Sequence, residues 1–352
     1  MTNPFFRGLA GGVLALALTA PVVQAGTIAL PESGSTLLYP LFQSWITGYK
    51  SVAPDTALTA SATGSTAGIE AAIKGTVRIG TSDAYLSDEE AAQHPDILNI
   101  PLAISAQTIN YNLPGVKAAN LKIDGPTLAA IYLGKITAWD DAAIRAMNPG
   151  VALPHHAIIP VRRADGSGDT FIFTQFLDFS ADTWENSPGY GTTVAWPNVD
   201  GEKTATGNEG MVQTLATTPY SIGYVGISYA DKIARAGIGT AMIKNQDGKF
   251  LLPTPQSISA GATELGKRTP AYERISLIYA PGAGSYPLVN YEYALVAASQ
   301  HDAATAEALR SFLRWAISAT GGNAANYLKP VGFIPLPDFI RGLSEAQIET
   351  IK

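Results

Sequence analysis

Arg162-Arg163-Ala164-Asp165-Gly166-Ser167-Gly168-Asp169-Thr170 is the stretch around which the rest of the sequence is organised. It combines two guanidinium groups, a carboxylate and a serine between two glycines. The apolar residues after it recur at the spacing of one helical face: Ile172, Phe173, Phe176 and Leu177. The backbone N–H groups of residues 167–170 are therefore expected to be the unpaired donors of a first helical turn. Such a turn attracts anions, and Arg163, held by Asp165, would add a planar fork of donors.

A purely structural interpretation of this stretch stays open. Ser167-Gly168-Asp169 before an apolar run is also an ordinary capping sequence. A carboxylate at position 169 would be stabilised by the helix dipole without any ligand. The stretch alone therefore does not separate an anion site from a helix cap.

Three loops rich in glycine and hydroxyl groups precede this stretch, each after a short strand-like segment. They are Glu32-Ser33-Gly34-Ser35-Thr36, Thr63-Gly64-Ser65-Thr66-Ala67-Gly68 and Gly80-Thr81-Ser82-Asp83. In an open α/β sheet, loops at the carboxyl ends of strands converge on one crevice. Thr36, Ser65 and Asp83 are therefore expected to face a common ligand. The alternative is three capped helices with nothing between them.

The remaining periodicity predicts an α/β protein whose chain crosses twice between two domains. The crossings are expected in the apolar segments at 97–112 and 286–296, and further strands at 157–161 and 220–225. Helices are expected at 126–133, 140–147, 227–235 and 303–320. The region from Phe179 to Asn208, with Trp184 and Trp196, is rich in Gly, Thr, Asn and Pro and is expected to form surface loops.

The first 25 residues are typical of a secretory signal peptide. Arg7 precedes an apolar run over 9–20, and Val23-Gln24-Ala25 forms a small-residue cleavage site before Gly26. No later run reaches the ~18 apolar residues of a transmembrane helix. An exported protein is therefore expected, and the periplasm stays open as its location.

Composition narrows the possible partners. The formal net charge is -6, so the protein gains no long-range attraction for nucleic acid or for an anionic membrane. Any bound anion must be captured by local dipoles. The sequence contains no cysteine, which excludes a lipid-anchored start, a disulfide scaffold and thiolate chemistry.

Catalytic motifs fail on inspection. The four histidines lack the spacing of metal ligands, and neither a P-loop lysine nor a dinucleotide fingerprint is present. Gly166-Ser167-Gly168 does not complete a nucleophile elbow, because Asp165 and Asp169 stand where that motif requires glycine. We therefore expect no catalytic residue, no metal and no cofactor. The sequence favours a binding protein over an enzyme.

Five separated motifs together resemble the periplasmic phosphate-binding protein of the high-affinity phosphate ABC transporter. They are Gly34-Ser35-Thr36, Gly64-Ser65-Thr66-Ala67-Gly68, Gly80-Thr81-Ser82-Asp83-Ala84, the stretch 162–168 and Ile222-Gly223-Tyr224-Val225. The resemblance covers nearly the whole chain after residue 25. It implies a two-lobed α/β fold of the type II periplasmic binding proteins, with one lobe formed by residues 26–105 and 285–352 and the other by residues 106–284.

The resemblance also implies a set of phosphate-binding residues in the cleft between the lobes. By motif, these are Thr36, Leu37, Ser65, Asp83, Arg163, Ser167, Gly168 and Asp169, with Asp165 orienting Arg163. Two positions depart from the family pattern: Leu37 replaces a common aromatic residue, and Asp169 stands where some members have a threonine hydroxyl. The implied partners are inorganic phosphate and the permease subunits of the transporter in the inner membrane.

Asp83 bears on specificity. A carboxylate accepts a hydrogen bond from a P–OH group but repels a fully ionised anion such as sulfate. Two alternatives remain: a receptor for another tetrahedral oxyanion (sulfate or molybdate), and a secreted phosphatase-like enzyme that uses the same cleft.

Overall fold

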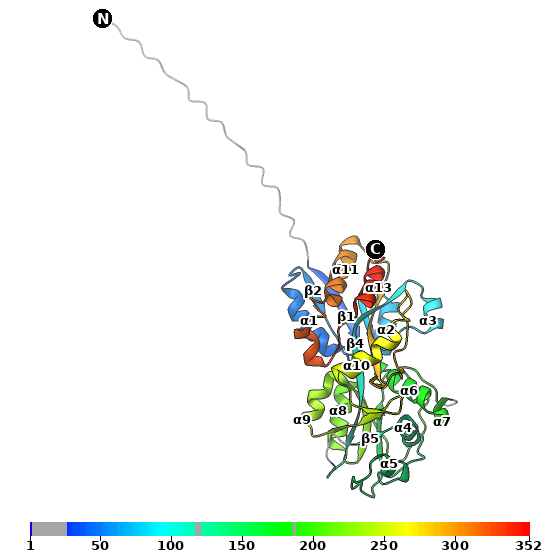
Figure 1. Cartoon of the computed structure of the whole chain (residues 1–352). Coiled ribbons are helices and arrows are strands. Elements are labelled where there is room, and N and C mark those ends of the chain that lie inside the picture. Colours follow the sequence, from blue (N-terminus) through cyan, green and yellow to red (C-terminus); the bar gives the residue numbers. More distant parts are fainter. Residues whose placement is uncertain (2–26, 117–120, 186–187) are drawn as a thin grey trace.

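The computed structural model describes Met1 and residues 27–116, 121–185 and 188–352. The expected signal peptide lies outside these ranges, apart from Met1. The chain forms two lobes, one above the other in Figure 1. In the described part, both lobes share a nine-stranded sheet in the order β2-β1-β3-β12-β4-β8-β6-β7, with β9 beside β4.

The upper lobe alternates strands and helices. Its elements in the first part of the chain are β1 (Ile28–Gly34), α1 (Tyr39–Lys50), β2 (Thr56–Thr59), α2 (Ser65–Ile73), β3 (Ile79–Ser82) and α3 (Asp88–Gln93). Strand β1 is parallel to β2 and β3, so the loops after β1 and β3 end at one edge of the sheet. The apolar stripe of α1 packs on α11 (Ala303–Ile317), where Phe42 and Tyr49 contact Phe312.

The lower lobe follows the same scheme. Its elements are β5 (Lys122–Ile123), α4 (Gly125–Tyr132), α5 (Ala142–Met147), β6 (Ile159–Arg163), α6 (Gly168–Ser180), α7 (Asp182–Glu185), β7 (Lys203–Ala205), α8 (Gly207–Thr217), β8 (Ser221–Gly226), η1 (Ile227–Tyr229), α9 (Ala230–Arg235), β9 (Gly239–Thr240), β10 (Met242–Lys244) and β11 (Phe250–Leu251). Strand β6 is parallel to β7 and β8. Helix α10 (Pro255–Gly266) lies near the junction of the lobes in Figure 1.

Two long strands join the lobes. Residues 97–106 of β4 (Ile97–Asn112) pair with β12 (Val289–Ala297), whereas residues 107–112 pair with β8. Strand β12 also pairs with β3. The chain then completes the upper lobe with α11, α12 (Ala325–Leu328), η2 (Lys329–Val331) and α13 (Asp338–Ile348). The first strand, β1, and the last helix, α13, therefore belong to the same lobe.

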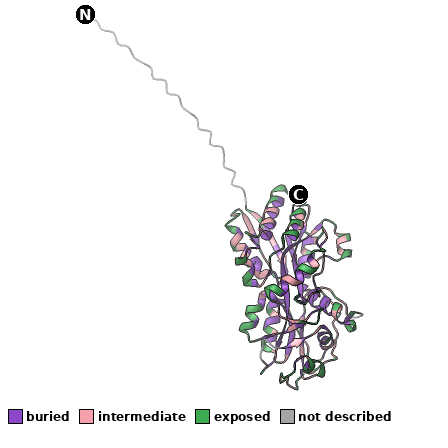
Figure 2. Cartoon of the chain, in the orientation of Figure 1, coloured by how far each residue is buried: buried purple, intermediate pink, exposed green. Residues whose placement is uncertain are grey.

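Most predicted elements are confirmed with boundaries shifted by a few residues, including the helices expected at 126–133 and 140–147 and the strand at 220–225. The prediction of surface loops for 179–208 is wrong at α7, at β7 and at the start of α8, and Trp184, which lies in α7, is fully buried. Its ring packs against Trp196 and donates to the Gly189 carbonyl. Figure 2 shows buried residues through the middle of both lobes and exposed residues on the outer faces of the helices.

Candidate functional site

Arg163 is the last residue of β6, and its guanidinium is enclosed by two carboxylates. Nε donates to Asp165 at 2.7 Å and Nη2 donates to the second oxygen of the same side chain. Nη1 donates to Asp169 Oδ2 at 2.7 Å. The Gly207 N–H also donates to Asp165, at 3.1 Å. Asp165 therefore holds one edge of the guanidinium through two parallel hydrogen bonds.

The neighbouring Arg162 points to a different environment. Its guanidinium pairs with Glu202 at 2.6 Å and lies over the ring of Trp196. Adjacent side chains of a strand point to opposite faces, which explains the separation of the two arginines.

Helix α6 begins beside Arg163. Ser167 is its N-cap and accepts a hydrogen bond from the Thr170 N–H at 3.4 Å. Gly168 and Asp169 form the first turn, and both are buried. A Cβ at position 168 would lie 2.4 Å from Asp83 Oδ2, so glycine is what allows Asp83 of the upper lobe to approach this turn. The helix N-terminus of one lobe thus meets a carboxylate of the other.

The upper lobe contributes the loops after its strands. Asp83 is 1% exposed and accepts from the hydroxyls of Ser35 and Ser65. Leu37 is fully buried against Gly226 of the lower lobe, and its carbonyl accepts from Ser228 at 2.7 Å. The small Gly226 leaves the space for this side chain.

Asn208 is a residue of this site that the sequence interpretation missed. It lies in the first turn of α8, and its side-chain amide donates to Thr36 Oγ1 at 2.9 Å and to Asp169 Oδ2 at 2.7 Å. Its side-chain oxygen Oδ1 accepts from the Gly226 N–H at 2.8 Å. Asn208 thus connects the loop of one lobe with the helix start of the other. A sequence pattern could have indicated this residue: a strand is followed by a glycine and a helix start at 205–208, as in the loops of the upper lobe.

Gln107 is a second missed residue. It lies where β4 passes from one lobe to the other, is fully buried, and donates to the Asp169 carbonyl at 2.8 Å and to its side chain at 3.3 Å. Because the surrounding strand is apolar, no sequence pattern assigned this single polar side chain to the site.

Burial raises the pKa of both Asp83 and Asp169. Burial raises the pKa of Asp169 to about 7, and the charge of Asp83 adds to this, whereas Arg163 opposes it. Burial also raises the pKa of Asp83, against the hydroxyl hydrogen bonds and Arg163. For Asp165, the contact with Arg163 outweighs burial and the pKa is lowered. The site therefore combines one permanent cation with carboxyls of unequal proton affinity.

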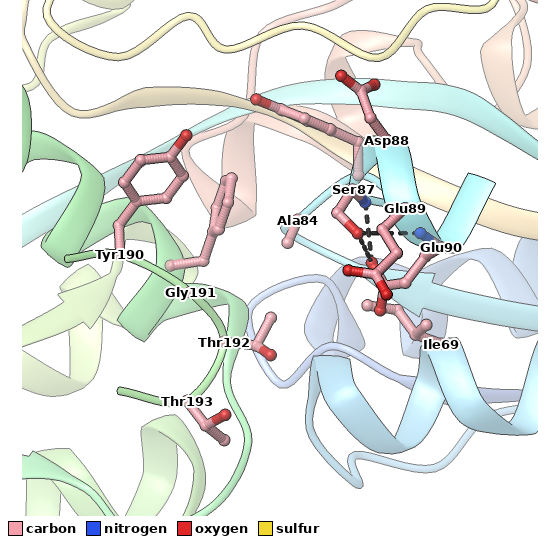
Figure 3. A pocket seen from close by; sticks show the side chains of 12 residues that line it. Ile69, Ala84, Ser87, Asp88, Glu89, Glu90, Tyr190, Gly191, Thr192 and Thr193 are labelled. Atoms are coloured by element: carbon pink, nitrogen blue, oxygen red, sulfur yellow. Dashed lines mark hydrogen bonds between the residues drawn. The ribbon is translucent and has the colours of Figure 1, made fainter. Parts of the chain in front are cut away.

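An open pocket of about 540 Å³ lies beside these residues, between the lobes. Figure 3 shows Tyr190, Gly191 and Thr192 on one side and Ala84, Ser87 and Glu90 on the other. Ser87 and Glu90 form a capping box at the start of α3. None of the eight expected phosphate ligands lines this pocket. It therefore lies beside the candidate site, and Ala84 of its lining follows Asp83 along the chain.

Three further contacts bridge the lobes near the site. Thr66 Oγ1 lies 2.9 Å from Thr192 Oγ1, and the Thr66 N–H donates to the Gly166 carbonyl at 3.3 Å. Tyr85 packs edge-on against Phe171. Within the described ranges, no group of three or more His, Asp or Glu residues is arranged to hold a metal ion, and no helix is long and apolar enough to cross a membrane.

Comparison with known proteins identifies the family of this chain. The phosphate-binding protein PstS of Methanocaldococcus jannaschii is 32% identical over 94% of this chain and 88% of its own length. The protein of that name from Haemophilus influenzae is also 32% identical, over 94% of this chain and 95% of its own. A solved phosphate-binding protein from Stenotrophomonas maltophilia shares the fold, with a TM-score of 0.69 at 18% identity over 90% of this chain and 93% of that one. The model of the PBP superfamily domain matches residues 22–320. The chain therefore belongs to the PBP superfamily and, within it, to the family of the phosphate-binding proteins PstS.

Proposed function

We propose that this protein captures inorganic phosphate between its two lobes and delivers it to the permease subunits of an ABC transporter in the inner membrane. The family relationship supports this function, because the relatives are named phosphate-binding proteins. The observation that carries it in the structure is the close approach of the Asp83 carboxylate of the upper lobe to the first turn of α6 in the lower lobe, within the electrostatic influence of Arg163.

The proposed ligands are the residues that the motifs indicated. Arg163 and the first turn of α6 supply charge-assisted and dipolar donors, which a dehydrated phosphate needs to offset its lost hydration. Hydroxyl groups of the upper lobe and the backbone at Leu37 add neutral donors. The full set is Thr36, Leu37, Ser65, Asp83, Arg163, Ser167, Gly168 and Asp169, with Asp165 as the support of Arg163.

Asp83 would provide the selectivity. An ionised carboxylate accepts from a P–OH group, whereas a sulfate dianion has no proton to give and leaves two anionic oxygens in contact. Receptors for sulfate or molybdate are disfavoured for this reason. The second buried carboxyl, Asp169, would accept a hydrogen bond from a second P–OH group of the ligand. Dihydrogen phosphate, with two such groups, would then satisfy both Asp83 and Asp169.

The lobes are proposed to be residues 26–105 with 285–352, and residues 106–284. The change of partner within β4, from β12 to β8 after residue 106, supports this division. Rotation of one lobe on the other would open the cleft, and closure would bury the ion and change the surface that meets the permease. Residues 1–25 are proposed to be a cleaved signal peptide that directs the protein to the periplasm.

The direct test is titration calorimetry of the purified protein with phosphate and with sulfate. We expect one phosphate per chain and sulfate binding weaker by a factor of at least about 100. Phosphate released in stoichiometric amount on gentle unfolding would support the same conclusion. A phosphatase-like enzyme would instead hydrolyse a chromogenic phosphate ester, and such turnover would contradict a pure binding role.

A further inference from the structure

Glu292 is a buried carboxyl behind the candidate site that the proposed ligand set does not use. It lies on β12, opposite Ala103 of β4, and is fully buried. Among the residues that the structure describes, no lysine, arginine or histidine forms an ion pair with it. An isolated buried carboxylate is strongly disfavoured, so this group is expected to be neutral.

The two oxygens of Glu292 have different partners. Oε1 accepts from the Ser105 hydroxyl at 2.5 Å. Oε2 finds no hydrogen-bond donor in the described part of the chain. Strand β12 is antiparallel to β3 with Tyr293 opposite Ser82, so the next position of this register places Glu292 opposite Asp83, and the two carboxyls interact. Two acceptor oxygens in contact are satisfied only by a proton between them. The geometry therefore requires one protonated carboxyl in this pair.

The surroundings decide which of the two carries the proton. Asp83 accepts from the hydroxyls of Ser35 and Ser65 and is attracted by Arg163, and these contacts favour its ionised form. Glu292 has only the Ser105 hydroxyl, and burial and the Asp83 charge raise its pKa well above the ordinary value. The proton therefore belongs to Glu292.

We propose that Glu292 is a positioning residue that donates a hydrogen bond to Asp83, so that Asp83 stays ionised and faces the anion site as an acceptor. This inference rests on the proposed function and adds a specificity residue to it. Without the donor, Asp83 would take up the proton itself and become a donor. A protonated Asp83 no longer repels sulfate, and selectivity would be lost.

The charged neighbours set the expected pH range. Asp83 is faced by Glu292 from β12, by Arg163 from β6 and by Asp169 from α6, and Glu292 is faced by Asp83 and Asp169. Without the Glu292 donor, the carboxyls of Asp83 and Asp169 and the guanidinium of Arg163 remain around the ligand. Protonation of Asp83 then extends to higher pH in the variant than in the parent, and the largest difference is expected on the acidic side of neutrality.

The experiment is competition of sulfate with labelled phosphate from about pH 5 to about 9 in the parent, E292L and E292Q. We expect sulfate to compete at least about tenfold better in E292L than in the parent near pH 6, which corresponds to about one pKa unit, with the difference shrinking as pH rises. E292Q is expected to retain exclusion within about threefold, because its amide donates to Asp83 and accepts from Ser105. D83N serves as the positive control for sulfate entry.

The matched control is E273L. Glu273 is also fully buried and also accepts from a serine hydroxyl, but its partners are Ser344 and Gln347 of α13. E273L should leave the competition curve unchanged. Equal sulfate entry in E273L and E292L would overturn the inference, and so would parent-like exclusion in E292L at every pH. Loss of exclusion in E292Q as large as in E292L would overturn it as well.

A spectroscopic measurement covers the case in which E292L does not fold. Infrared difference spectra of the parent and E292Q at neutral pH should show the carbonyl band of one protonated carboxylic acid that is missing in the variant. A carboxylate band in its place contradicts the inference. A parent that binds no phosphate would overturn the proposed function itself, and that failure is recognised before any variant is compared.

Discussion

Asp169 and Arg163 form a buried ion pair across the turn between β6 and α6, with 2.7 Å between Oδ2 and Nη1 and both side chains 1% exposed. The same carboxylate oxygen accepts from the Asn208 amide. An internal anion thus occupies the guanidinium nitrogen that Asp165 leaves free. A bound phosphate would share Arg163 with it, and the charge state of Asp169 should control the affinity.

The first prediction concerns this carboxylate. Burial raises the pKa of Asp169 to about 7, so it loses its proton over the same range as phosphate, whose second ionisation lies at about 6 to 7 by analogy with phosphomonoesters. Phosphate affinity of the parent should therefore fall as pH rises from about 6 to 8. In D169N the fall should be smaller by about tenfold, as measured by calorimetry at each pH. Parallel curves would restrict Asp169 to stabilising the helix start.

The second prediction concerns Arg163. R163A should weaken phosphate binding by ~2 to 5 kcal/mol, or roughly 30-fold or more, because a hydrogen-bonded charge pair is removed. R163K, which keeps the charge without the planar fork, should bind with intermediate affinity and guards against misfolding of R163A. Calorimetry is the measurement, and a loss below about threefold in R163A argues against the assignment.

The adjacent arginine provides the control. Arg162 pairs with Glu202 outside the site, so R162A should bind phosphate with nearly the parental affinity. A large loss in R162A would mean that the two side chains are not separated by the strand as described.

The third prediction concerns Asp83. D83N should keep phosphate affinity within about tenfold and make sulfate a better competitor, because an amide donates where the carboxylate only accepts. Competition of sulfate with labelled phosphate measures this directly. Unchanged sulfate exclusion would place the selectivity in another residue.

The fourth prediction concerns Asn208, which joins Thr36 of one lobe to Asp169 of the other. N208A should lower phosphate affinity by ~1 to 3 kcal/mol, mainly through faster release, because bonds that form on closure are lost. Stopped-flow release kinetics measure the effect. N112A is the control: Asn112 donates to the carbonyls of Leu215 and Ala216 within the lower lobe, and its removal should leave the release rate unchanged.

The fifth prediction concerns the dependence of stability on pH. Burial raises the pKa of Glu32 and of Glu273 to about 8 each, although each group accepts hydrogen bonds that oppose the shift. The folded state therefore holds protons that the unfolded chain has released above about pH 4.5. The free energy of unfolding should fall as pH rises from about 5 to 8, by up to ~1.4 kcal/mol per pH unit for each group.

Denaturant titrations at several pH values test this dependence. E273Q should flatten the curve, because an amide keeps partners at all pH values. A parent whose stability rises over the same interval would contradict the assignment of a neutral Glu273.

The sequence predicted those parts of the site that are local in the chain. The stretch from Arg163 to Asp169 contains the guanidinium, its support and the helix start together, and the loops at Thr36 and Asp83 follow short strands. Asn208 and Gln107 were not predicted as site residues, because their role depends on contacts with segments that are distant in the sequence. A single polar residue in an apolar strand carries no periodic signal, and only the folded chain shows which carboxyl it meets.

Trp184 illustrates the other kind of miss. The composition around it is typical of loops, and loops usually lie on the surface. Its burial comes from a partner twelve residues further on, Trp196, with which it forms an aromatic pair. Tertiary packing of two large rings therefore overrode the local composition.

The position of β12 has a consequence for the order in which the protein folds. This strand, residues 289–297, separates β3 from β4 in the sheet, although both neighbours are made from the first third of the chain. Until β12 is added, β3 and β4 have no common partner, and the upper sheet is divided. Contacts of such long sequence separation form slowly. A chain released in stages would thus keep its upper lobe open until nearly all of it is available, which would suit the proposed export if the chain crosses the membrane unfolded.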